Sequence, residues 1–270
     1  SPYSSGTYNT ALGYNSLASF TTGYQNVMIG AFKGDAITTG YNNTALGYGA
    51  LSAEDTGTRN VAIGNEALNV LNYDGAGYNV AVGHRAGYAL TTGTVNTFIG
   101  AFAGGATDDG TRNVALGYAA MDTGNAGDDN IAIGYGALQD TTASSNIAIG
   151  SSAMIQHTTG ARNIAIGHAA MDDTDAGSNS LGSSDNIFMG YDAGGGTWAD
   201  VASIQNVVIG NNSADASFSG ANYNVGMGTN VYGALTQGDA NSAFGHGSLT
   251  ALTTGGSNVA VGNAAGSTMT

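Results

Sequence analysis

Apolar positions recur along this chain in a fixed five-residue pattern: an Asn, three residues that are almost all apolar, and a Gly. The word NIAIG, for example, occurs at 130–134, 146–150 and 163–167. Aligning all such words gives fifteen copies, most often 17 residues apart. Their first residues are Asn9, Asn26, Asn43, Asn60, Asn79, Asn96, Asn113, Asn130, Asn146, Asn163, Asn186, Asn206, Asn224, Asn241 and Asn258.

A fixed period of this size is the signature of a solenoid, in which each unit is buried only by its neighbours. The repeats cover nearly the whole chain and leave no linker between them. We therefore predict an all-β parallel β-solenoid of about fifteen coils, forming a single repeat domain over residues 1–270. A three-sided hexapeptide β-helix is disfavoured, because it needs an aliphatic residue every six positions.

Side chains two positions apart in a strand share a face. The first residue after Asn is Val, Ile or Thr in all copies but one, and the third is always large and apolar. We therefore expect these two columns to face the inside of the coil. The residue between them, most often Ala, is expected to face outward. Because that outward column is apolar too, for example at Ala132, Ala148 and Ala165, the sequence predicts a homo-oligomer packed through it.

The other positions of the repeat predict turns. The Gly that ends each word suits a backbone with φ > 0 or a close approach of chains. Ala or Ser usually follows three residues later, which indicates a second short strand or a bend that closes the coil. The Asn column is expected to form a ladder of amide hydrogen bonds along the solenoid.

Composition narrows the class of protein. The 270 residues include 45 Gly, one Pro and no Cys, and 19 acidic against 5 basic residues give a net charge of −14. Nucleic-acid binding is disfavoured because clusters of Lys and Arg are absent. No apolar run reaches the ~20 residues that a membrane-spanning helix needs. We expect neither nucleic-acid binding nor membrane insertion.

The run N-[VIT]-A-[IL]-G-x-x-[AS], as in NVAIGNEA (60–67) and NIAIGSSA (146–153), resembles the head repeats of YadA-type trimeric autotransporter adhesins. The phrase NTALGYNSLASFTTGYQN (9–26) is even more similar to repeats in bacteriophage tail fibres. The resemblance implies a left-handed β-roll, a homotrimer and surface attachment, in a virion or outside a cell. Adhesin head units are usually shorter than these.

One column of the repeat carries rings that can stack on sugars through an apolar face and a polar edge. The alternative is that these rings cover exposed Gly backbone at a turn. Metal binding by the His residues is disfavoured, because they lie in separated coils. The candidates for contact with a host glycan or protein receptor follow the pentad Gly directly: Tyr14, Tyr48, Tyr118, Tyr135, Tyr191, His84, His168 and His246.

The longest repeats predict loops that leave the solenoid wall, at 171–185 and 191–205. The second loop carries the only Trp, Trp198, together with Asp192 beside Tyr191. We expect Trp198 either to contact a receptor or to serve packing, by plugging the gap beneath its own loop or sealing a subunit junction. Acidic pairs such as Asp108–Asp109 offer a weak Ca²⁺ hypothesis, and no cofactor is otherwise expected.

The sequence thus favours a structural and adhesive fibre segment, most readily a phage tail fibre that contacts a host cell surface. A bacterial adhesin head or another extracellular fibre protein is the alternative. An ice-binding β-solenoid is a further one, since TTG recurs at one phase of the repeat, although only 21–23 and 38–40 lie in adjacent coils. No arrangement typical of a catalytic centre is found, so we do not expect an enzyme.

Overall fold

A computed structural model describes residues 6–32, 34–174, 182–198 and 201–270. The tips of the two predicted loops, at 175–181 and 199–200, lie outside the described residues. The chain divides into two compact units, residues 1–130 and 131–270. The same repeat builds both units, and each is described by itself.

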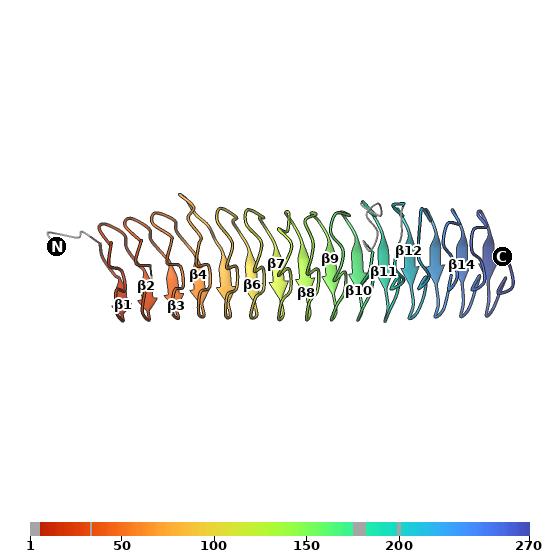
Figure 1. Ribbon diagram of the computed structural model, residues 1–270, viewed down its shortest axis with the longest axis horizontal. Helices are drawn as coiled ribbons and strands as arrows, with labels where there is room; N and C mark the ends of the chain where they lie inside the picture. The colour runs from red at the N-terminus through yellow and green to blue at the C-terminus, as the bar shows by residue number, and fades with distance from the viewer. Residues whose placement is uncertain (1–5, 33, 175–181, 199–200) are drawn as a thin grey trace. The chain divides into compact units, whose positions relative to one another are not determined.

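Short parallel strands build both units, and each strand starts directly after a repeat Asn. Within each unit, every strand pairs in parallel with the next one along the chain, as Figure 1 shows. The first unit contains β1 (Thr10–Leu12), β2 (Val27–Ile29), β3 (Thr44–Leu46), β4 (Val61–Ile63), β5 (Val80–Val82), β6 (Thr97–Ile99) and β7 (Val114–Leu116). The second contains β8 (Ile131–Ile133), β9 (Ile147–Ile149), β10 (Ile164–Ile166), β11 (Ile187–Met189), β12 (Val207–Ile209), β13 (Val225–Met227), β14 (Ser242–Phe244) and β15 (Val259–Val261). The predicted parallel β-solenoid is confirmed.

Each repeat contributes one strand, and bends and turns close the coil. Of the two alternatives for the return side, a second strand or a bend, the described residues show the bend. The cause lies in the backbone, because several positions of each repeat have φ near +60°, which interrupts any extended segment. One of these positions is the residue just before each Asn, and there the chain never uses Gly, as at Gln25, Arg59 and Val95.

The predicted orientation of the strand residues is wrong. The middle residue is buried in every strand except β1, whereas the first and third residues are buried in none. Ala132, Ala148 and Ala165 are fully enclosed within their own coils and cannot meet a neighbouring subunit. The aliphatic residues that flank them form the outer face instead.

The physical reason is the narrow interior of the coil. The middle strand residue shares that interior with the residue six positions later, and the two sizes compensate. Phe98 is followed by Gly104, where a Cβ atom would lie 2.7 Å from the Phe98 ring. The order is reversed at Gly226, where a Cβ atom would lie 2.7 Å from the ring of Tyr232. Ala fits the middle position because Leu or Met usually fills the other, which gives the dense packing typical of protein interiors.

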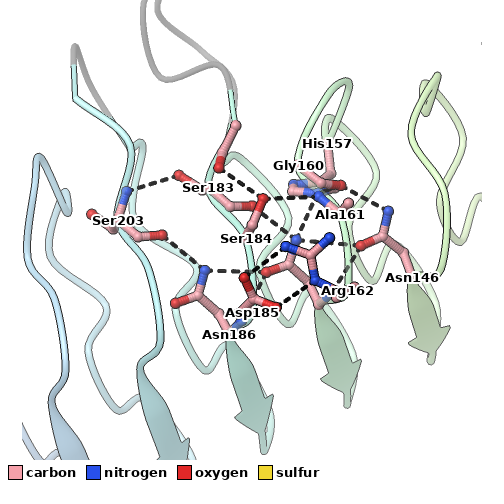
Figure 2. Close-up of polar contacts among 12 residues, drawn as sticks. Asn146, His157, Gly160, Ala161, Arg162, Ser183, Ser184, Asp185, Asn186 and Ser203 are labelled. Atoms are coloured by element: carbon pink, nitrogen blue, oxygen red, sulfur yellow. Dashed lines mark hydrogen bonds and ion pairs between the residues drawn. The ribbon is translucent and has the colours of Figure 1, made fainter.

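The predicted Asn ladder is confirmed. In both units the backbone N–H of one repeat Asn donates to the side-chain Oδ1 of the Asn before it, as between Asn163 and Asn146 at 2.9 Å. The Nδ2 of Asn146 donates to the Gly160 carbonyl oxygen at 2.8 Å, on the return turn (Figure 2). Each such side chain therefore ties the start of one strand both to the next strand and to the turn that leads into it. The ladder satisfies backbone groups that would otherwise be buried without partners.

Candidate functional site

The predicted column of rings lies on the outside of both units, at the point where each strand ends. His84, His168 and His246 are exposed. The tyrosines expose half or more of their surface, with the smallest value, 51%, at Tyr118 and the largest, 70%, at Tyr14. The remaining exposed tyrosines of the column are Tyr48, Tyr135 and Tyr191.

Neighbouring rings of this column contact one another. In the first unit Phe32 lies edge-to-face between Tyr14 and Tyr48, with ring centroids 5.5 and 5.7 Å away. In the second unit His168 stacks on Tyr191, with centroids 5.4 Å apart and planes 14° apart. Such contacts stabilise by roughly 0.5–1.5 kcal/mol each beyond burial, so the rings hold one another in place.

The first unit repeats the three-ring arrangement at Phe102, which lies between His84 and Tyr118 at 5.1 and 5.8 Å. Sequence reasoning missed Phe32 and Phe102, because both stand one position later than the column. The signal was present in the sequence. Each follows an Ala (Ala31 or Ala101) at the place where the column would carry its ring.

Trp198 lies in the interior. Only 1% of its surface is exposed, its ring stacks on Phe218 with centroids 5.2 Å apart, and Phe188 meets it edge-on at 5.4 Å. Its indole N–H donates to the Gly194 carbonyl oxygen at 3.0 Å. Of the two roles expected for Trp198, the structure supports packing beneath its own loop.

Asp192 lies near other carboxylates, and its backbone N–H donates to the His168 carbonyl oxygen at 2.9 Å. Burial, and after it the charges of Asp192 and Asp173, raise the pKa of Asp172 to about 6. Burial and then Asp192 also raise the pKa of Asp215. These acids come from successive coils of the second unit. Nowhere in the described ranges do three or more His, Asp or Glu side chains come together as a metal site would require.

Three of the five basic residues lie at the opposite end of the strands, just before the repeat Asn. Arg112 bonds Asp129 at 2.6 Å and Arg162 bonds Asp185 at 2.6 Å, so each arginine pairs with an acid of the following coil. Arg59 instead lies over the rings of Tyr41 and Tyr78, 5.2 and 5.5 Å from their centroids. These exposed contacts orient the edge of the sheet and contribute little to stability.

Threonines at the position of the repeat where TTG recurs form hydrogen bonds between neighbouring coils. The hydroxyl of Thr21 donates to the Thr38 carbonyl oxygen at 2.9 Å, and Thr236 donates likewise to Thr253 at 3.1 Å. The hydroxyl of Thr91 also contacts a carboxylate oxygen of Asp108. These hydroxyl protons are therefore directed along the solenoid, which favours a structural role for the column.

No pocket is found in the described part of the chain. That part also contains no helix long and apolar enough to cross a membrane. Comparison with protein-family models, with curated proteins and with solved structures gives no match. The candidate site is therefore defined by its own geometry, an exposed row of rings at the ends of parallel strands.

Proposed function

We propose that this chain is a structural and adhesive fibre segment, a left-handed homotrimeric β-roll of the kind found in phage tail fibres, which contacts a host cell surface. The observation that carries the proposal is the outer face of the strands. Its first and third columns present Val, Ile, Leu, Met and Thr to solvent through both units, and Ile147 and Ile149 in β9 are typical. Continuous apolar surface of this kind marks an interface in soluble proteins.

Charge supports a second and third copy of this chain as the occupants of that face. The chain carries a net charge of −14, yet none of the fifteen strands contains Asp, Glu, Lys or Arg. Like-charged copies repel least where they carry no charge. Parallel copies in the same register would also place equivalent coils side by side, so that every coil buries the same aliphatic pair. Three copies around one axis close the assembly without leaving a face exposed.

The test of assembly uses two substitutions in one coil. Ile209→Asp puts a charge on the outer face of β12, and Asn211→Asp puts the same charge two residues later, where the side chain is exposed and its Oδ1 accepts from the Tyr191 N–H at 3.0 Å. We expect Ile209→Asp to dissociate the trimer and Asn211→Asp to leave it intact. Sedimentation velocity measures both. A trimer that survives Ile209→Asp would contradict the proposed interface.

Adhesion is tested with the labelled trimer on a panel of intact bacterial cells. Saturable binding to some strains and not to others is expected, and it should weaken when Ile209→Asp removes the avidity of three linked copies. Ser217→Asp, which puts a charge on an exposed residue of the same coil outside the column of rings, is the matched control and should bind as the parent does. If the trimer binds none of the strains, the adhesive part of the proposal is contradicted, while the structural part still stands.

A further inference from the structure

The exposed rings of the first unit form two similar arrangements, which we call the aromatic triads: Tyr14–Phe32–Tyr48 and His84–Phe102–Tyr118. In each triad the central Phe meets both flanking rings edge-to-face, at interplanar angles between 75° and 84°. The central residue always follows an Ala, so a shift of one position keeps the row of rings continuous. A repeated, exposed and mutually braced arrangement is a surface on which a ligand meets pre-organised groups.

The residue types of this column are those that recognise sugars. The position after the pentad Gly is Tyr, His or Asn in most coils, as at Tyr14, Asn65 and His84. Tyr and His join an apolar ring to a polar edge, and Asn both donates and accepts hydrogen bonds. The same position never carries Asp, Glu, Lys or Arg, although the chain has 19 acids. The first position after the pentad Gly is therefore uncharged on an acidic protein, and at the next position Glu66 and Arg85 neutralise each other in an ion pair at 2.6 Å.

We propose that the aromatic triads bind an extended, uncharged glycan that lies along the solenoid. The proposal rests on the adhesive function proposed above and names its ligand class. Neighbouring coils are ~4.8 Å apart, close to the length that one pyranose ring adds to an extended chain. The two flanking rings of a triad lie two coils apart, so they can meet alternate sugar rings of such a chain. Anionic polysaccharides are disfavoured because the protein would repel them.

The exposure of the flanking rings separates this proposal from a packing role. Tyr14, Tyr48 and Tyr118 expose 70%, 53% and 51% of their surface, whereas Phe32 and Phe102 are partly covered between them. The central rings thus act as supports, and the flanking rings present most of the exposed ring surface. Phenol and imidazole groups can exchange hydrogen bonds with sugar hydroxyls.

The experiment measures binding of neutral hexasaccharides to the intact chain by calorimetry. The probes are β-1,4-linked hexamers of glucose and of N-acetylglucosamine, with an alginate hexamer as the anionic comparison. The variant His84→Ala/Tyr118→Ala removes both flanking rings of one triad and leaves Phe102 in place. The control is Tyr223→Asn, which removes a tyrosine of similar exposure (55%) that precedes a strand instead of following one and whose φ of +60° Asn tolerates.

We expect at least one neutral hexamer to bind, with about tenfold weaker binding in the double variant and unchanged binding in the control. Alginate should not bind. If the parent chain attaches to cells but binds neither neutral hexamer, the glycan proposal is overturned while the adhesive function stands. If the double variant loses trimer mass in sedimentation, the triads are a subunit contact and the proposal is overturned as well. If the parent protein neither attaches to cells nor binds sugar, both the glycan proposal and the adhesive function are overturned.

Discussion

In β9, Ala148 is fully buried while Ile147 and Ile149 on either side of it stay partly exposed, although all three are apolar. The inner column of middle residues and the two outer columns are thus all apolar, although the inner column is buried and the outer columns face solvent. Position in the strand decides which residue is enclosed, because the middle residue is buried whether it is Ala148, Phe98 or Gly226. The lesson is that in a coil this thin the bulkier residues can be the outer ones, provided that another surface covers them.

The largest effects are expected when a charge is placed in the inner column or in an outer column of the same strand. Ala148→Asp buries a carboxylate at a site that is 0% exposed, without a basic partner in that strand. We expect it to cost more than about 4 kcal/mol and to unfold the surrounding coils. Ile149→Asp should leave the coils folded and dissociate the copies. Circular dichroism distinguishes the two results, and a normally folded Ala148→Asp would reverse the assignment of inside and outside.

A second prediction concerns the size compensation inside the coil. Phe98→Ala should cost about 4 kcal/mol, and Gly104→Leu alone should also destabilise, because its Cβ would lie 2.7 Å from the Phe98 ring. Together they recreate the Ala and Leu combination of other coils, such as Ala45 with Leu51. We expect the double variant to recover about 2 kcal/mol of the summed loss.

Chemical denaturation of the four proteins of this cycle measures the coupling between Phe98 and Gly104. Leu51 has φ of +52°, so Leu is compatible with the backbone that Gly104 adopts at +62°. The control is Phe102→Ala, since Phe102 lies in the same coil on the outside. It should lose less than about 1.5 kcal/mol. Purely additive losses for Phe98→Ala and Gly104→Leu would contradict the shared interior.

Much of the fold could be predicted from the sequence, because the repeat fixes the strands and the Asn ladder. Which face is buried was predicted wrongly, since alternation was expected to place the larger residues inside. The correct answer was present in the sequence as the inverse sizes of residues six apart, at Phe188 and Gly194 or at Gly226 and Tyr232. A pattern between two columns is invisible when each column is considered alone.

The candidate site was only partly predictable for a related reason. Tyr14 and Tyr118 could be found because they stand at one position of the repeat, and their exposure follows from the turn after the strand. Which of its two expected roles Trp198 has could not be predicted, because its burial depends on contacts with Phe188 and Phe218 from elsewhere in the chain. Sequence spacing gives no information on how a longer coil folds its extra residues.

The third prediction concerns the pH dependence of stability that a polar residue of the interior, Glu54, should cause. Glu54 is fully buried, and its carboxylate accepts from the Gly57 N–H at 2.7 Å. Burial raises its pKa from 4.5 to about 7, and the charge of Asp55 adds to the effect. The folded chain therefore binds a proton more tightly than the unfolded chain. Its contribution to stability is complete below pH 4.5 and is lost as the pH rises to about 7, by about 3 kcal/mol in total.

Glu54→Leu tests this, because Leu90 and Leu235 stand at the same position of their own coils, six residues before the next repeat Asn. We expect the free energy of unfolding of the variant not to fall between pH 4.5 and 7, so that the variant is more stable than the parent at pH 8. Denaturation curves across this range measure the difference. Parallel pH profiles for the two proteins would show that Glu54 does not titrate on folding.

The smallest effect is expected at an outer residue whose backbone is strained. Val95 has φ of +62° and exposes 51% of its surface, and a β-branched residue is disfavoured in this conformation. Val95→Asn keeps the N–H bond to the Gly77 carbonyl oxygen at 2.7 Å and should stabilise by about 1 kcal/mol. Val201→Asn, at a similarly exposed Val without positive φ, should bring no gain. Thermal denaturation compares the two, and equal shifts would mean that the conformation of Val95 carries no cost.

The central claim is that the outer columns are covered by further copies of the same chain. Sedimentation equilibrium of the unmodified protein, at concentrations from nanomolar to micromolar, tests it most directly. The account predicts a single species of three times the chain mass over the upper part of that range. A stable, soluble monomer at every concentration would contradict it, because the aliphatic face would then remain open to water.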